Sequence, residues 1–174
     1  MQNEVKIFEE KIIWNKKEFF CEYIDGLDFS NIKPITQVQA LCFLPNRTFV
    51  IFEDINGNYG LPGGSIETGE SLEKALFREL QEEAAVQPIK YGPLLYLRIT
   101  NLSKKPLAIT YQVRYWALVK LLNEKVSDPV GKAMRRRIVK EKELLKLVKW
   151  GKKLKIYLEQ MKKLRTQQIV STKY

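Results

Sequence analysis

The residues best suited to chemistry lie between Leu61 and Val86, in the stretch LPGGSIETGESLEKALFRELQEEAAV. A Pro-Gly-Gly turn and a small polar loop lead into a segment that carries an arginine and clustered carboxylates. These charged residues are Arg78, Glu79, Glu82 and Glu83. Oxygen ligands of this kind suit Mg²⁺ or Mn²⁺, which bind phosphates together with carboxylates and water. The stretch therefore predicts a cation site made by a loop and a helix.

The segment from Ser71 to Ala84 has the apolar spacing of a helix, with Ser71 as a plausible N-cap. A helical wheel places Glu79 and Glu83 at the margin of the apolar stripe. Glutamate-rich helix faces are commonly just solvated, but a solvated face would keep its carboxylates away from that margin. Like charges at i and i+4 also repel. These glutamates therefore need a counter-charge, which Arg78 supplies in part and a divalent cation can complete.

Composition narrows the chemistry further. The chain has no histidine, which excludes zinc sites, catalytic triads and general bases that depend on histidine. Cys21 and Cys42 are the only cysteines, and we expect both to be reduced core residues, with one disulfide as the alternative. No apolar run approaches the roughly 18 residues of a membrane span, and the N-terminus lacks a signal pattern. We therefore expect a cytoplasmic protein without a membrane partner.

The spacing from Gly64 to Val86 resembles the signature of the Nudix hydrolases, G-x5-E-x7-R-E-U-x-E-E-x-G-U, where U is a bulky aliphatic residue. The match covers 23 residues of the chain. The matching positions are Gly64, Glu70, Arg78, Glu79, Leu80, Glu82, Glu83 and Val86. The sequence departs at Ala85, where the signature has glycine. If that glycine adopts a positive φ beyond the helix, alanine costs about 1 kcal/mol there without removing a ligand.

The resemblance implies an α/β/α sandwich with a mixed sheet, against which the signature helix lies. It also implies Mg²⁺-dependent hydrolysis, with Mn²⁺ as the alternative cation, of a nucleoside diphosphate linked to another group, such as a nucleoside triphosphate, nucleotide sugar or dinucleotide. By position, Glu79, Glu82 and Arg78 resemble the catalytic residues. Metal ligands would come from the Gly63 carbonyl and from Glu79, Glu82 and Glu83. Glu70 resembles an outer acid.

The general base stays open, because some members of the family use a carboxylate outside the signature. Glu124, Asp128 and Glu141 are the candidates here. The substrate also stays open. In the strand-like segment Thr110 to Leu121, alternation places Arg114 and Trp116 on one face, where they can contact a nucleotide.

The other elements follow from local patterns. We expect an N-terminal hairpin, in which Lys11–Trp14 and Glu18–Ile24 flank a turn, that serves as an interface, a lid or an extra sheet edge. Further strands are expected at 38–44, 48–52, 91–98, 110–121 and 138–139, and further helices at 141–149 and 152–165. The resulting division is an N-terminal extension (1–34), a Nudix domain (35–150) and a basic C-terminal helix and tail (151–174), frayed from Thr166 on.

Charge leaves two other functions in play. Residues 1–120 hold 14 basic against 15 acidic side chains, whereas residues 121–174 hold 16 against 5. A basic end attracts phosphates, so an RNA-directed hydrolase is an alternative to an enzyme acting on a small nucleotide. A non-catalytic module that binds a nucleotide or nucleic acid is a second alternative, although the intact carboxylate set argues against it. A homodimer is compatible with the sequence.

Overall fold

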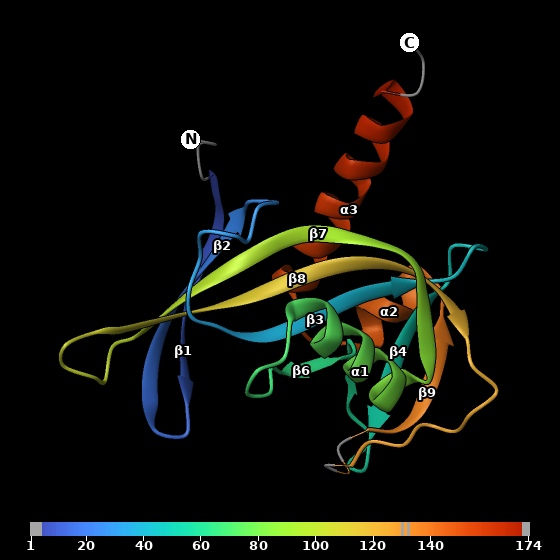
Figure 1. The fold of residues 1–174 in the computed structure, drawn as a ribbon, viewed down its shortest axis with the longest axis horizontal. Coiled ribbons are helices and arrows are strands. Elements are labelled where there is room, and N and C mark those ends of the chain that lie inside the picture. Colours follow the sequence, from blue (N-terminus) through green and yellow to red (C-terminus); the bar gives the residue numbers. More distant parts are fainter. Residues whose placement is uncertain (1–4, 130, 132, 172–174) are drawn as a thin grey trace.

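The computed structural model describes residues 5–129, 131 and 133–171, and its strands form one mixed sheet (Figure 1). The strands are β1 (Val5–Trp14), β2 (Lys17–Asp25), β3 (Ile35–Phe43), β4 (Phe49–Asp54), β5 (Tyr59–Gly60), β6 (Gly63–Ser65), β7 (Val86–Asn101), β8 (Ala108–Leu121) and β9 (Ala133–Val139). The helices are α1 (Leu72–Ala84), α2 (Glu141–Leu147) and α3 (Lys152–Ser171). The strand order is β1-β2-β7-β8-β3-β4-β5, with β6 paired to β3 and β9 to β4. The β3–β8 pair is parallel.

Two hydrophobic cores occupy the two faces of the sheet. On one face α1 packs against alternate residues of the central strands, among them Val38, Val113 and Ala117. On the other face α2 and α3 pack against residues that include Leu41 and Ile51. Because successive side chains of a strand point to opposite faces, β3 supplies both cores. This arrangement confirms the expected α/β/α sandwich with a mixed sheet.

The N-terminal hairpin extends the edge of that sheet. Asn15 and Lys16 take positive φ angles of 48° and 61° in its two-residue turn, as tight hairpins require. Strand β2 then pairs along β7, from Phe19 opposite Asn101 to Ile24 opposite Tyr96. Of the expected roles for this hairpin, the structure therefore shows the sheet edge.

The basic helix α3 is a structural element of the core. It buries Leu154, Tyr157, Leu158 and Met161 against the sheet. On its polar side, lysine side chains reach acidic residues of other elements, with N–O distances of 3.3 Å for Lys153–Glu10, 2.7 Å for Lys162–Glu141 and 3.4 Å for Lys163–Asp25. Deleting α3 would therefore expose the core. A role of its positive charge in binding phosphates has to be tested by substituting its exposed lysines instead.

Several element limits differ from the sequence-based expectation. Strand β9 begins at Ala133, not at residue 138, because Arg135 and Arg137 are matched by Glu53 of β4, 2.9 and 3.9 Å away. The run of charged arginines interrupts the apolar alternation by which a strand is recognised in a sequence. Helix α3 continues through the residues expected to fray, to Ser171, while 172–174 lie outside the described residues.

Both cysteines are free and buried, as expected. The helices within the described residues are each too short or too polar to span a membrane.

Candidate active site

The glycine pair of the loop forms the short strand β6, which pairs with β3 from Gln37 to Gln39. Gly63 has a φ of 148°, and a Cβ on it would lie 2.4 Å from the backbone of Val38 and Gln39. A Cβ on Gly64 would instead lie 2.4 Å from Oε1 of Glu79. The first glycine therefore lets β6 approach β3, and the second lets a carboxylate of α1 approach the loop.

Helix α1 is fixed at both ends. The Ser71 side chain accepts a hydrogen bond from the Lys74 backbone N–H, as predicted for an N-cap. Ala85 follows the helix with φ 47° and ψ 52°, so the residue that replaces the signature glycine does adopt the left-handed conformation. Arg136 of β9 donates from Nη1 to the Ala85 carbonyl at 2.7 Å. A cation at a helix C-terminus is stabilising, and this arginine was not foreseen from the sequence.

Arg78 contacts most members of the acidic cluster, which consists of Glu70, Glu79, Glu82 and Glu83. Its Nε and Nη2 form a two-point pair with the Glu70 carboxylate, each bond 2.9 Å long. Its Nη1 reaches Glu79 at 2.8 Å and Glu82 at 3.3 Å. Its Nη2 also donates to the Ser65 carbonyl at 3.0 Å, and its Nε lies 4.0 Å from Oε1 of Glu67. One guanidinium therefore orients carboxylates from both the loop and the helix.

The hydrogen bonds from Arg78 lower the pKa of Glu70 below its ordinary value. The same contacts raise the pKa of Arg78, which stays charged at any working pH. The Glu70–Arg78 pair thus contributes stability above the unfolded pKa of glutamate, and this contribution is lost as the pH falls through the lowered folded pKa.

Glu79 and Glu83 lie where the helix meets the loop. Their side chains are buried, with 8% and 3% of their surface exposed. Oε2 of Glu83 accepts a hydrogen bond of 2.8 Å from the Gly63 backbone N–H. This bond holds the Glu83 carboxylate next to Gly63, whose carbonyl oxygen is an expected metal ligand. Helix and loop are therefore already joined through the expected ligand set.

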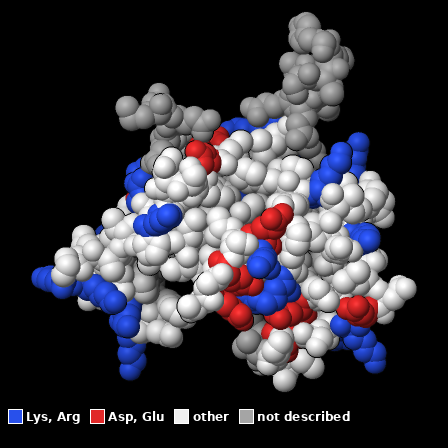
Figure 2. Space-filling view, viewed as in Figure 1, with Lys and Arg blue, Asp and Glu red and all other residues white. Residues whose placement is uncertain are grey.

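The surface over α1 shows this excess of negative charge, with acidic side chains gathered around a basic group (Figure 2). Glu70, Glu79 and Glu82 are paired with Arg78, whereas Glu83 accepts from the Gly63 N–H. These carboxylates, with backbone carbonyl oxygens, are the donors that Mg²⁺ and Mn²⁺ prefer, so the residue types fit such an ion. Among the described residues, no three acidic or cysteine side chains converge closely enough to hold a metal. Three of the glutamates pair with Arg78 instead.

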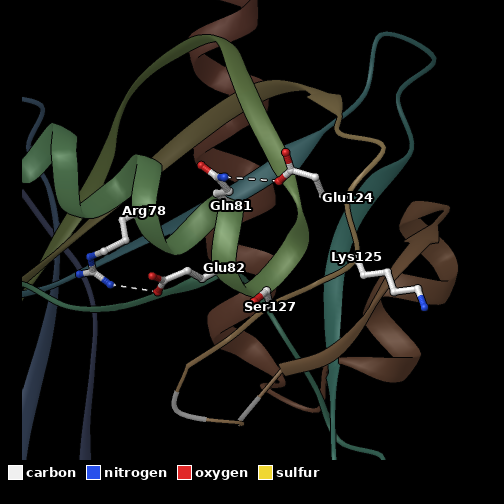
Figure 3. Close-up of a pocket in the computed structure, with 6 residues that line it drawn as sticks. All are labelled: Arg78, Gln81, Glu82, Glu124, Lys125 and Ser127. Atoms are coloured by element: carbon white, nitrogen blue, oxygen red, sulfur yellow. Dashed lines mark hydrogen bonds and ion pairs between the residues drawn. The ribbon is translucent and has the colours of Figure 1, made fainter.

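A cleft of about 430 Å³ opens beside the cluster (Figure 3). It is lined by Arg78, Gln81, Glu82, Glu124, Lys125 and Ser127. The backbone N–H of Ser127 donates to the Glu82 carbonyl at 3.2 Å, which attaches the loop after β8 to α1. The sequence did not predict that Gln81, Lys125 and Ser127 line a cleft. Nothing in the local sequence indicates that the loop after β8 approaches α1.

The three candidate bases outside the signature are separated by the fold. Glu124 lines the cleft with Glu82, and its Oε2 accepts from Gln81 Nε2 at 3.4 Å. Asp128 does not line the cleft, and its Oδ2 accepts from the Ala133 backbone N–H at 2.8 Å. Glu141 begins α2 on the opposite face of the sheet and pairs with Lys162. Glu124 is therefore the candidate that shares the cleft.

Arg114 and Trp116 share one face of β8, as alternation predicted, and in the structure that face lies opposite α1. Arg114 is buried, and its Nε donates to the Tyr157 hydroxyl at 2.8 Å. Trp116 packs against Phe43, with ring centroids 6.4 Å apart. Arg114 lines a second cavity and Trp116 does not. Their role as substrate contacts stays a prediction.

We expect Arg78→Gln to lower the free energy of unfolding by about 2 kcal/mol at pH 7, because clustered carboxylates lose their counter-charge. This loss corresponds to a Tm lower by about 4–8 °C for a chain of this size. The gap between wild type and variant should shrink near pH 4, where protonation removes the repulsion. Thermal unfolding from pH 4 to 7 measures both effects. A gap that is independent of pH would show that Arg78 acts by packing alone.

The chain matches a known protein family over the residues that form this site. A family model described as the NUDIX domain matches residues 35–157, a range that contains β6, α1 and the cleft. No curated protein sequence matches the chain.

Several solved structures share the fold. A mutant of the Bacillus subtilis pyrophosphohydrolase BsRppH has a TM-score of 0.69 at 17% identity, over 90% of this chain and 97% of that chain. A NUDIX hydrolase from Nitrosomonas europaea has a TM-score of 0.57 at 17% identity, over 74% and 88%. The NUDIX domain of Shewanella oneidensis NrtR, complexed with ADP ribose, has a TM-score of 0.50 at 23% identity, over 70% and 83%. At these identities the likeness concerns the fold.

Proposed function

The chain belongs to the Nudix family, and from that premise we propose that it is a pyrophosphohydrolase that uses Mg²⁺ or Mn²⁺ to cleave a phosphoanhydride bond in a nucleoside diphosphate linked to another group. One observation carries the proposal: Glu79 and Glu83 lie at the Gly63–Gly64 loop, and Arg78 links Glu79 to Glu82. Clustered carboxylates at a partly buried site are costly unless positive charge offsets them. Arg78 offsets one charge of this set, and a divalent cation with phosphate oxygens would offset the rest.

Glu79, Glu82, Glu83 and the Gly63 carbonyl are the groups that would hold the cation. When bound, it would neutralise charge on the phosphate oxygens and favour in-line attack by water. Arg78 orients Glu79 and Glu82 through the bonds described above. Glu83, hydrogen-bonded to the Gly63 N–H, ties the helix to the loop. The protein's own part in the reaction is thus to position oxygen ligands and exclude bulk water from the buried ones.

A proton must leave the attacking water as its oxygen bonds to phosphorus and the P–O anhydride bond breaks, with the electron pair going to the leaving phosphate. We assign that proton to a carboxylate facing the cleft. Glu82 is accessible there, with 26% of its side chain exposed, and Glu124 lines the same cleft. Comparing the pH–rate profiles of Glu82→Gln and Glu124→Gln separates them, because loss of the base removes the acidic limb of the profile.

A substrate panel tests this function. We expect Mg²⁺ or Mn²⁺ to support phosphate or pyrophosphate release from at least one nucleoside triphosphate, nucleotide sugar or dinucleoside polyphosphate, and EDTA to abolish it. A short RNA with a 5′-triphosphate belongs in the panel, because Lys125, Arg135 and Arg136 line a hollow next to the cleft. Tight binding of one nucleotide without hydrolysis of any would contradict the proposal and favour a binding module.

A further inference from the structure

A second cavity, of about 250 Å³, lies on the sheet face that carries α3. The parallel register of β3 and β8 sets Gln39 beside Arg114 and Gln37 beside Gln112. These four side chains form a polar floor, and Tyr23, Trp150 and Tyr157 add aromatic walls. The volume is sufficient for a flat ring system, and aromatic walls suit stacking. The cavity is therefore built for a planar polar ligand.

One atom of this floor has no hydrogen-bond partner within the part of the chain that the structure describes. The Gln39 side chain is 9% exposed, and its Oε1 is buried without a donor. Its orientation is fixed, because Nε2 donates to the Leu61 carbonyl at 3.2 Å and a flipped amide would set two oxygens against each other. Buried acceptors in native proteins are normally satisfied. Gln39 thus calls for a ligand that supplies an N–H or O–H donor.

Arg114, next to Gln39, calls for an acceptor. It is 5% exposed, and its described hydrogen bonds go to neutral oxygens of Tyr157, Val113, Gln112 and Gln37. A buried guanidinium is best satisfied by a strongly polar oxygen. An internal phosphate of a nucleotide would serve Arg114 but has no proton for Gln39. The pair therefore fits a group that places a carbonyl next to an N–H.

We propose that this cavity binds the nucleobase of the substrate by its lactam edge, so that the ring carbonyl accepts from Arg114 and the adjacent ring N–H donates to Gln39 Oε1. The inference rests on the proposed nucleotide hydrolysis. Guanine and uracil present this edge, whereas adenine and cytosine offer a ring nitrogen, a weaker acceptor for a guanidinium than a carbonyl oxygen. The enzyme therefore prefers guanine and uracil nucleotides.

The cavity is connected to the acidic cluster through one residue. Gly63 pairs with Gln39 across β6 and β3, and its N–H donates to Glu83. Gln39 and the glutamates of α1 therefore meet at the same short strand. A base held at Gln39 places its ribose and phosphates within reach of the loop that carries the proposed cation ligands.

The test is isothermal titration calorimetry with GMP, UMP, AMP and CMP in EDTA, which removes the proposed cation. These nucleotides have no phosphoanhydride bond, so the proposed reaction cannot consume them. We expect GMP and UMP to bind at least about tenfold more tightly than AMP and CMP, a ratio typical of one well-formed polar contact. Gln39→Leu, similar in size, should weaken GMP binding about tenfold or more. Gln87→Leu, on the exposed side of β7, is the matched control and should leave all four affinities unchanged.

A measurement on the wild-type protein guards against a variant that misfolds. GMP methylated at N1 lacks the donor for Gln39 and should bind about tenfold or more weakly than GMP. Equal affinities for the four nucleotides, or for GMP and its methylated form, would overturn the base assignment. Hydrolysis without base preference would defeat this inference and leave the proposed function standing. Base preference without hydrolysis of any substrate would do the reverse.

Discussion

Replacing Glu83 with glutamine is expected to lower divalent-cation-dependent hydrolysis by about 100-fold or more, which is at least about 2.7 kcal/mol of transition-state stabilisation. Glutamine keeps an oxygen for the bond from the Gly63 N–H, now 2.8 Å long, so the loop and helix stay joined. What is lost is one negative charge at a side chain with 3% exposure. Steady-state kinetics on the best substrate of the panel, over a Mg²⁺ titration, measures the loss.

Glu73→Gln is the matched control for this change. Glu73 lies on the same helix, is exposed, and accepts a hydrogen bond from Tyr91 away from the cluster. Its replacement should leave kcat/KM within about twofold, as surface changes generally do. If Glu83→Gln kept the wild-type rate and the same Mg²⁺ dependence, Glu83 would not be a ligand, and the charge of the cluster would need another explanation.

The two loop glycines are expected to fail in different ways when each is replaced by alanine. At Gly63 the new Cβ meets the backbone of Val38 and Gln39 at 2.4 Å, and neither strand can yield without breaking its pairing. We expect the free energy of unfolding to fall by about 3 kcal/mol or more. At Gly64 the Cβ meets the Glu79 carboxylate, which can rotate away. Stability should fall by only about 1 kcal/mol, while turnover falls at least about tenfold because Glu79 is displaced.

Chemical denaturation and steady-state kinetics on both variants separate these effects. Gly57→Ala is the control, because Gly57 has a φ of 75° but open space around it. Alanine there should cost about 1 kcal/mol of stability and leave kcat/KM unchanged. Full activity of a folded Gly64→Ala protein would mean that the position of Glu79 is not critical for turnover.

Local patterns were enough to predict the part of the site formed by consecutive residues. The cap at Ser71 and the helix ending at Ala84 depend on contacts within a few positions, which spacing reveals. The left-handed residue at 85 was expected only on the condition that the signature glycine adopts a positive φ, and Ala85 does so. Alternation in β8 likewise placed Arg114 and Trp116 on one face, although only the structure shows that this face lies opposite α1. These features need no knowledge of which strands meet.

The rest depends on pairings between distant segments. The parallel pairing of β3 with β8 brings Gln39 next to Arg114, 75 positions away along the chain. Neither composition nor local pattern predicts which strands pair. The distance along the chain also could not tell Glu124, which lines the cleft, from Glu141, which lies on the other face. Arg136 reaches the end of α1 only because β9 pairs with β4. Tertiary pairing, not local propensity, completes the site.

The most direct test of the central claim is the binding of Mn²⁺ to the wild-type protein and to the Glu79→Gln, Glu82→Gln, Glu83→Gln triple variant, measured by electron paramagnetic resonance on the same samples used for turnover. The account predicts that the wild type binds Mn²⁺ and hydrolyses a nucleotide in proportion to the bound ion. The folded triple variant should bind at least about tenfold more weakly and lose measurable turnover. Equal Mn²⁺ affinity in the two proteins, or wild-type turnover in EDTA, would contradict it.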